Sequence, residues 1–433
     1  MLLILAGVTI AAVSGDNGIL TRAADSKEKT EIADIKEELQ RKILEEQITN
    51  DGDLTETELE TILTSKGTLS DETDILDRTL TTTKGSYEIP VRDIWNGTFT
   101  GGASGGGGGS GSGLTDTADT KPGAAMPSGA TVIEADPSKG IVIKDSKNNE
   151  WVWIEVPKTT VFTSAQSSTD YDNIKANLIA YATDYRKGSA SQSYNWTDEW
   201  YSGCGIADSG TYTKTYQKML SSVYENGGFW IGRYEAGVSN TTPRTGKGEI
   251  TGLEAKSQPD MYPFNFVTCS QAQTLASAMS TDSNKTSSLM FGIQWDLVCK
   301  YLEGKDGLTK ADINSDSTNW GNYNNIAVPI KSVNAKQSTN SGSSWSAITE
   351  SKAKNSSIIL STGASNNTKK MNIYDFAGNE LEWTLEKTSN TSLPCAFRGG
   401  SCGGNGSSIP ASDRGYYSTS GSDGDISFRP SLY

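Results

Sequence analysis

Cysteine is the residue type with the widest chemistry in this chain, because the 433 residues include no histidine. The absence of histidine excludes Ser-His and Cys-His catalysis, histidine-ligated zinc, iron or copper, and histidine proton shuttles. The five cysteines are Cys204, Cys269, Cys299, Cys395 and Cys402. An odd number cannot pair completely and none lies in a Cys-x-x-Cys motif, so the spacing indicates neither a disulfide framework nor a zinc site.

Two of these cysteines fall where helices are predicted. Cys299 shares an apolar stripe with Trp295 and Val298, so we expect it to be a core residue. Cys269 directly precedes a predicted helix that Ser270 can cap, and a helix start is a position that stabilises a thiolate. Cys269 has no basic neighbour in the sequence, however, and we expect it to be inert packing as well.

Segment 402–427 has a composition suited to binding. It contains no Lys, Glu, Gln, Trp or Met, although the rest of the chain uses all five. Tyr416 and Tyr417 offer rigid amphipathic contact area, while Ser, Asp and Gly offer adaptable hydrogen bonds, as in antibody paratopes. We expect the ligand-binding side chains to share one exposed face: Cys402, Asn405, Ser408, Ile409, Asp413, Tyr416, Tyr417, Ser418, Asp423, Asp425 and Ser427.

Residues on either side of this segment must hold it, whichever side chains it carries. We therefore expect Arg398, Gly399, Phe428 and Arg429 to be buried. Ion pairs between the two arginines and buried carboxylates would fix both ends of the segment.

The first hundred residues predict an apolar segment followed by a long amphipathic helix. Residues 1–13, MLLILAGVTIAAV, fall short of the ~20 apolar residues that a membrane-spanning helix needs. They are a signal remnant, a buried helix or the end of a longer hydrophobic helix. The helix that follows carries Ile32, Ile35, Leu39 and Ile43 at helical spacing, and a small strand-bearing region, SYEIPVRDIW, comes after it.

This order of elements resembles the type IV pilin and pseudopilin family over roughly the first hundred residues. The stretch LLILAGVTIAA followed by GDNGIL is similar to the end of the pilin hydrophobic segment in Gram-positive bacteria. The leader peptide, its cleavage site and the acidic residue near the mature N-terminus are missing, so we expect the start to be internal to the gene product. The resemblance implies a cell-surface protein, anchored in a membrane or pilus, with other pilin subunits as partners. The alternative is an ordinary packed or coiled helix.

A glycine-rich stretch divides the chain into two parts. Residues 101–113, GGASGGGGGSGSG, cannot bury enough surface to fold and predict a flexible tether. Beyond it, GIVIKDSKNNEWVWIEVP predicts two strands around a turn at residues 147–149. We assign 1–100 to the pilin-like helix and a small α+β region, 101–131 to a linker and 132–433 to one large domain.

Four stretches of the large domain occur in an order typical of one family: GGFWIGRYEAG (227–237), YPFNFVTCSQAQTLASAM (262–279), SSLMFGIQWDLVCKYL (287–302) and NIYDFAGNELEWT (372–384). Together with RGG at 398–400 and FRP at 428–430, they resemble the formylglycine-generating enzyme, or sulfatase-modifying factor, family. The resemblance covers most of residues 140–433 and implies an α+β domain with a C-type lectin-type fold.

The copper chemistry of that family does not carry over to this sequence. Its enzymes bind copper through two closely spaced cysteines just after the RGGS-like element. Here Cys402 follows Ser401, no later cysteine exists, and Cys395 lies on the other side of the anchor. The resemblance therefore implies the fold without the chemistry, and we expect a protein that is not an enzyme.

The same family also suggests a calcium site. Its AGNELEW-like region helps to bind calcium, and Asn379 and Glu382 match positions where oxygen ligands are expected. The alternative is that Asn379 caps a turn and Glu382 pairs with Arg398 or Arg429.

The residue types missing from 402–427 fit one genetic process. Randomising the adenines of AAC or AAT codons yields Gly, Ser, Asp, Tyr, Cys, Ile, Thr and Arg, but never the five missing types. The segment therefore resembles the variable proteins of diversity-generating retroelements, many of which use the C-type lectin fold and vary the stretch next to its C-terminus. The alternative is that Gly, Ser and Asp simply dominate a long loop.

Charge excludes one class of partner. With 52 acidic and 38 basic residues, the net charge of −14 repels phosphate backbones, so we expect no nucleic acid. The leading hypothesis is a pilus-associated, adhesin-like protein whose ligand is a protein or glycan on another cell or phage surface. The alternatives are an oxidase of the formylglycine-generating type with an altered metal site and a purely structural minor pilin.

Overall fold

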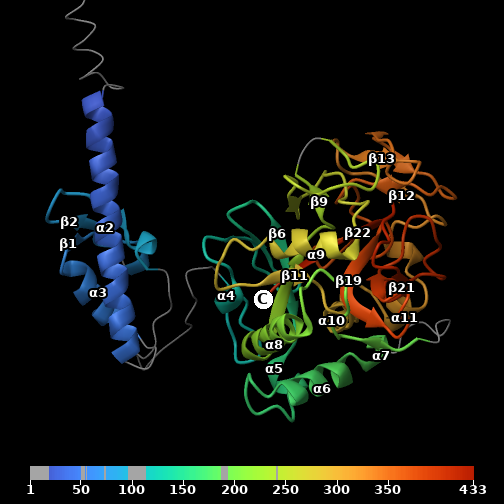
Figure 1. The fold of residues 1–433 in the computed structure, drawn as a ribbon, viewed down its shortest axis with the longest axis horizontal. Helices are drawn as coiled ribbons and strands as arrows, with labels where there is room; N and C mark the ends of the chain where they lie inside the picture. Colours follow the sequence, from blue (N-terminus) through green and yellow to red (C-terminus); the bar gives the residue numbers. More distant parts are fainter. Residues whose placement is uncertain are drawn as a thin grey trace, which may run out of the picture. The chain divides into compact units, whose positions relative to one another are not determined.

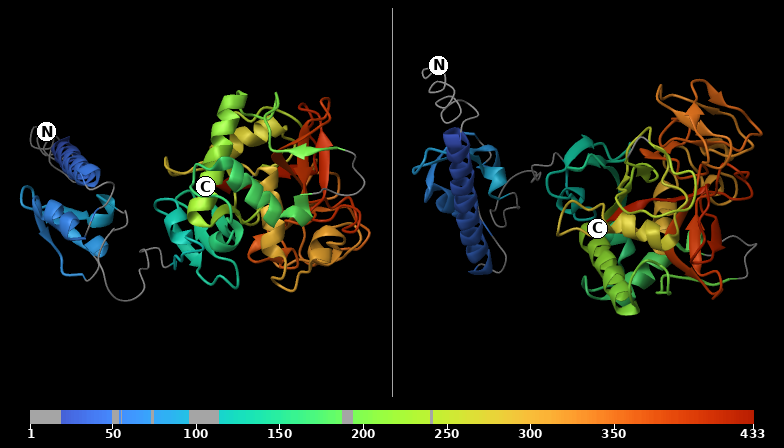
Figure 2. Two further views of the ribbon diagram at one scale, coloured as in Figure 1. Left: turned by 90° about the horizontal axis from the view of Figure 1, so that it is seen from below. Right: turned by 45° about the horizontal axis from the view of Figure 1, so that its top comes forward.

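The computed structural model describes residues 19–49, 54, 56–72, 75–95, 114–186, 194–239 and 242–433 (Figures 1 and 2). The chain divides into two compact units, residues 1–107 and 108–433. Each unit has a hydrophobic core of its own. The predicted apolar run at 1–13 and the predicted tether at 101–113 lie outside the described residues.

The smaller unit packs a long helix against a short helix and a small sheet. Its helices are α2 (Ile19–Thr49) and α3 (Glu56–Thr64), with 3-10 turns η1 (Ile75–Asp77) and η2 (Val91–Asp93). The antiparallel sheet has the order β1 (Gly67–Leu69), β2 (Thr79–Thr82), β3 (Glu88–Pro90). Leu39 and Ile43 of α2 are buried with Leu59 and Leu63 of α3, which confirms the predicted amphipathic helix. In the described residues, no helix is both long enough and apolar enough to cross a bilayer.

A six-stranded antiparallel sheet forms one side of the core of the larger unit. Its order is β11 (Ser287–Leu289), β23 (Pro430–Leu432), β8 (Gly228–Gly232), β6 (Glu150–Glu155), β5 (Val142–Lys144), β4 (Thr131–Glu134). The predicted pair of strands around residues 147–149 is confirmed, because Val142 of β5 faces Val152 of β6. One oxygen of Asp145 accepts the backbone N–H groups of Lys147 and Asn149, both at 2.9 Å, and so closes the turn.

A second sheet carries the C-terminal part of the sequence. Its order is β21 (Arg414–Tyr417), β20 (Cys395–Arg398), β19 (Leu381–Thr388), β22 (Ile426–Phe428), and β7 (Trp196–Thr197) pairs with the far end of β19. The β19–β22 pair is parallel and the others are antiparallel. Short two- and three-stranded pieces complete the unit: β9 (Gly237–Val238) with β10 (Ala255–Lys256), β12 (Val328–Pro329) with β15 (Ser351–Lys352), β13 (Lys336–Ser338) with β14 (Ser346–Ala347) and β16 (Ile359–Leu360), and β17 (Lys369–Lys370) with β18 (Ile373–Tyr374).

Helices surround and join the two sheets. They are α4 (Pro122–Ala125), α5 (Lys158–Val161), α6 (Tyr171–Tyr181), α7 (Thr183–Arg186), α8 (Ser209–Asn226), α9 (Cys269–Ser277), α10 (Gly292–Leu302) and α11 (Lys310–Asn314), with a 3-10 turn η3 (Thr318–Trp320). Helix α10 contacts both β6 and β19, so it links the two sheets. Figure 1 shows α6 and α8 on one side of the unit and β19 and β21 on another.

Two details of the predicted organisation change. The cap of α9 is Thr268, whose side chain accepts the N–H of Gln271, and not Ser270, because the helix already begins at Cys269. Residues 114–131, assigned above to the linker, include buried Leu114 and helix α4, so the larger unit begins before residue 132. The architecture is mixed α/β and is compatible with a C-type lectin-type fold.

Candidate functional site

Segment 402–427 runs through the second sheet. It follows β20, includes β21, and ends in β22. The pairing of Arg398 with Arg414 joins β20 to β21, and the parallel pairing of Leu381 with Ile426 joins β19 to β22. The segment therefore consists of two loops, 402–413 and 418–425, whose ends are fixed by strands.

Two arginines on neighbouring strands share two buried carboxylates. Arg398 lies 2.8 Å from Asp296 and 3.3 Å from Glu386, and Arg414 lies 2.7 Å and 3.1 Å from the same two residues. All four side chains are fully buried, and Arg186 adds a third guanidinium 2.9 Å from Glu386. The predicted burial and ion pairing of Arg398 are confirmed.

Arg414 is a structural residue that the sequence analysis missed. Besides the two carboxylates, its guanidinium donates to the backbone oxygen of Tyr185 at 2.7 Å. The only signal in the sequence is that Arg414 is the sole basic residue of segment 402–427. Substitution at this position would leave two buried carboxylates short of a cation, so the segment is not variable throughout.

The other end of the segment is fixed by Arg429. Its guanidinium binds both oxygens of Glu382, at 2.7 and 3.1 Å, and donates to the backbone oxygens of Gly232 and Tyr374, each at 2.9 Å. Gly399 and Phe428 are buried as well, so the expected burial of the anchors is confirmed.

The two anchoring glutamates have different electrostatics. Burial raises the pKa of Glu386, but the nearby guanidinium groups of Arg414, Arg398 and Arg186 outweigh it and hold that pKa below its usual value. Burial raises the pKa of Glu382 to about 7, because a single guanidinium, that of Arg429, only partly offsets it. The ionised form of Glu382 in β19, paired with Arg429 just after β22, is therefore less strongly stabilised than that of Glu386.

Most of the predicted binding side chains reach solvent. Asn405, Ser408, Tyr417 and Asp423 are exposed, and Ile409, Asp413, Tyr416, Ser418 and Asp425 are half-buried. The predicted exposure is wrong for Cys402 and Ser427, which are buried. Cys402 donates its backbone N–H to Asn379 beneath the first loop, and Ser427 lies in β22 opposite Glu382, where the strand is covered on both faces.

Three aromatic side chains support the two tyrosines: Tyr194 just before β7, Trp196 in β7 and Trp383 in β19. The Tyr416 ring lies 4.9 Å from that of Tyr194 and 6.4 Å from that of Trp196. Tyr417 is 39% exposed, and its ring packs 6.5 Å from that of Trp383. Tyr194 and Trp196 precede the segment by about two hundred residues, so their part in this surface could not be predicted from it.

Two glycines restrict the loops further. A Cβ on Gly406 would lie 2.2 Å from the backbone nitrogen of Thr318, and a Cβ on Gly424 would lie 1.8 Å from the backbone oxygen of Ser341. Backbone atoms cannot yield as a flexible side chain can. Together with Arg414, these glycines confine acceptable variation to the exposed positions between them.

The proposed calcium ligands are engaged with protein groups. Glu382 binds Arg429, as the alternative interpretation expected. The Asn379 amide donates to Glu235 at 2.6 Å, and its oxygen accepts from Asn322 at 2.8 Å and from the N–H of Leu360 at 2.9 Å. Within the described ranges, no three Cys, Asp or Glu residues are grouped to hold a metal ion. The geometry therefore favours the structural interpretation of Asn379 and Glu382.

The cysteines are buried throughout. Burial, reinforced by the charges of Glu380 and Asp425, raises the pKa of the Cys402 thiol well above its usual value. Cys299 is fully buried, with its pKa raised to about 12, which confirms it as a core residue. Cys269 is buried too, and its thiol lies 3.3 Å from the Tyr201 hydroxyl and interacts with the Cys395 thiol.

Comparison with known proteins gives little. No protein-family model and no curated protein sequence matches the chain. Among solved structures, Treponema denticola variable protein 1 is similar with a TM-score of 0.27 and 17% identity, over 47% of this chain and 84% of that chain. A TM-score at this level does not establish a shared fold.

Proposed function

We propose that the larger unit is a ligand-binding domain with a C-type lectin-type fold of the formylglycine-generating kind, and that loops 402–413 and 418–425 form its binding face. One observation carries this proposal: fully buried arginines fix both ends and the middle of the segment, while nine of the eleven candidate side chains between them are exposed or half-buried. A rigid frame holding exposed Tyr, Ser, Asn and Asp is the arrangement of a paratope.

Truncation of the tyrosines tests the binding face. We expect Tyr416→Ala and Tyr417→Ala each to weaken binding of hits from a glycan array or a phage-displayed peptide library by about 2 kcal/mol. Tyr224→Ala on α8 removes an aromatic ring elsewhere and serves as the control. Hits that bind the tyrosine variants as tightly as the unmodified protein would contradict the proposal.

Diversification of this face is a separate proposal with its own test. Sequencing the gene across many isolates should show differences concentrated at the exposed loop positions, with Gly406, Arg414 and Gly424 unchanged. A nearby reverse transcriptase gene and a template that differs only at adenines would complete the case. Isolates that vary equally at Arg414 and at the exposed positions would refute it.

We further propose that the protein is displayed on the cell surface through its pilin-like N-terminal part and is not an enzyme. The high pKa and burial of Cys402 support the second point. Incubation with copper and a cysteine-containing sulfatase peptide is expected to give no formylglycine, and turnover abolished by Cys402→Ser would overturn this. Antibodies against residues 114–433 should label intact producing cells, and labelling only after lysis would reject surface display.

A further inference from the structure

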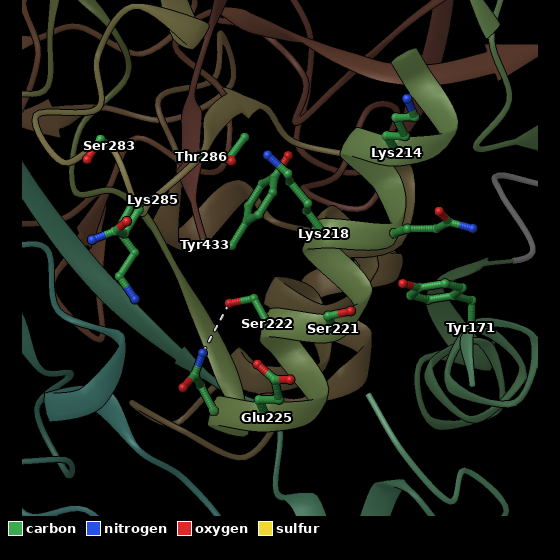
Figure 3. Close-up of a pocket in the computed structure, with 13 residues that line it drawn as sticks. Tyr171, Lys214, Lys218, Ser221, Ser222, Glu225, Ser283, Lys285, Thr286 and Tyr433 are labelled. Atoms are coloured by element: carbon green, nitrogen blue, oxygen red, sulfur yellow. Dashed lines mark hydrogen bonds between the residues drawn. The ribbon is translucent and has the colours of Figure 1, made fainter. Parts of the chain in front are cut away.

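A surface hollow lies beside helix α8, and most of the charged residues that line it are lysines. It has a volume of about 520 Å³ and lies between one face of α8, the loop before β11, and Tyr433. Figure 3 shows Lys214 and Lys218 one turn apart on α8, with Lys218 extending toward Tyr433, and Lys285 on the opposite wall. Figure 1 places α8 and β21 on different sides of the unit, so this hollow is separate from the binding face proposed above.

The charge of the hollow is opposite to that of the chain. The protein carries a net charge of −14, but the described lining contains three lysines and one acidic residue, Glu225. Lys214 and Lys218 form no ion pair within the part of the chain that the structure describes. Two exposed cations one helical turn apart repel each other, so an anion placed between them would be stabilised.

Lys285 is a half-buried cation with few partners. Its ammonium group has three donors, and the hydrogen bond seen among the described residues is a long one, 3.4 Å to the backbone oxygen of Ala124. Burial lowers its pKa, and the charges of Asp282 and Glu225 offset this only in part. Each oxygen of Asp282 accepts a backbone N–H at 2.8 Å, from Ser128 and Asn284, and none of the ion pairs among the described residues joins Asp282 to Lys285. The Lys285 charge is therefore poorly compensated in the free protein.

The uncharged part of the lining suits a sugar. Hydroxyl and amide groups, including those of Ser222, Asn226 and Thr286, line it together with the half-buried ring of Tyr171. Hydroxyl and amide groups can bind sugar hydroxyls, and the Tyr171 ring offers an apolar face. The volume of about 520 Å³ falls within the range of small-molecule sites.

We propose that this hollow binds an acidic oligosaccharide, with sulfate or carboxylate groups held by Lys214, Lys218 and Lys285. The lysines act as point charges, which accommodate several anion geometries without the fixed fork of arginine. The site is independent of loops 402–413 and 418–425. Because exposed charges contribute, affinity should fall as salt rises.

The test is isothermal titration calorimetry, in which a sulfated tetrasaccharide and its desulfated form are each titrated into the full chain. We expect the sulfated form to bind and Lys218→Gln/Lys285→Gln to bind about tenfold more weakly, or ~1.4 kcal/mol. Glu225→Gln should bind more tightly, because it removes the acidic residue of the lining. The matched control, Lys331→Gln/Lys354→Gln, removes two exposed lysines elsewhere and should leave affinity unchanged.

Three results would overturn the proposal. They are no binding by the unmodified protein, equal binding of the desulfated sugar, and equal losses in the control and in the Lys218/Lys285 variant. Lys218→Gln alone, at an exposed position, guards against misfolding caused by the change at half-buried Lys285. Tyr417→Ala should not affect this titration, so failure here and failure of the proposed binding face are distinguishable.

Discussion

Glu380 is a buried carboxyl group beneath the proposed binding face that has no cation beside it in the described part of the chain. It is fully buried, one of its oxygens accepts from Asn265 at 3.2 Å, and the other has no hydrogen-bond partner among the described groups. Burial raises its pKa well above the usual value, the charge of Asp425 raises it further, and the neighbouring Ser427 and Asn265 side chains offset this only in part. The folded state therefore favours the protonated acid, since no neighbouring cation stabilises the charge.

This predicts a dependence of stability on pH. A raised pKa in the folded state contributes stability at low pH that is lost as pH rises through that pKa, and Glu382, at about 7, acts in the same direction. Glu380→Gln keeps the shape of the side chain but cannot ionise. At pH 8.5 we expect its free energy of unfolding to exceed that of the original protein by about 1 kcal/mol or more. Urea unfolding between pH 6 and 8.5 checks this. Identical pH profiles for the two proteins would contradict it.

At the scale of elements, buried ion pairs hold the second sheet together in addition to the backbone hydrogen bonds between its strands. Asp296 of α10 and Glu386 of β19 bind Arg398 of β20 and Arg414 of β21, so one buried cluster joins four elements. A complete buried ion cluster stabilises the folded state little more than apolar packing would. Removing one member, however, leaves a buried charge without compensation and destabilises the fold. The value of this cluster is geometric, because it fixes the strands between which the loops emerge.

We therefore expect Glu386→Gln to lower the free energy of unfolding by about 3–5 kcal/mol, since three guanidinium groups then lose a carboxylate. The control lies near the same strand: Glu199 is 3.9 Å from Lys387 and 61% exposed. Glu199→Gln should cost less than about 1 kcal/mol, as exposed pairs do. Urea unfolding of both variants measures the two losses of unfolding free energy. If both losses were small and equal, the cluster would not support the sheet.

The sequence predicts this frame only in part. Arg398 and Arg429 could be picked out because they stand at the borders of the unusual composition. Arg414 could not, since its carboxylate partners lie 28 and 118 residues away. Burial of Cys402 and Ser427 was missed for a similar reason: composition marks a segment, whereas its exposure depends on which strand covers it. Helices α9 and α10 were found because apolar spacing is a local signal.

At the scale of the whole molecule, the two units are separate in their packing. The core of the smaller unit extends from Leu39 to Ile94, and that of the larger unit from Leu114 to Tyr433, without shared members among the described residues. A unit with its own core can fold alone. Substitutions in loops 402–413 and 418–425 are therefore expected to leave the folding of the N-terminal unit unaffected.

Two fragments test where the larger unit begins. The larger unit depends on residues 114–131, because Leu114 is buried, Trp153 donates its indole N–H to Thr120 at 2.8 Å, and Trp230 donates its indole N–H to Ala125 at 3.1 Å. We expect fragment 114–433 to unfold in one cooperative transition at the temperature of the larger unit in the full chain.

Fragment 132–433, which begins at the boundary predicted from the sequence, lacks these partners. It should be less stable by at least about 2–4 kcal/mol, because it loses a buried leucine and leaves two indole donors in the core without acceptors. Scanning calorimetry of both fragments and the full chain measures the difference. If the shorter fragment proved as stable as the longer one, residues 114–131 would be a linker after all, and the glycine-rich stretch would not mark the true edge of the domain.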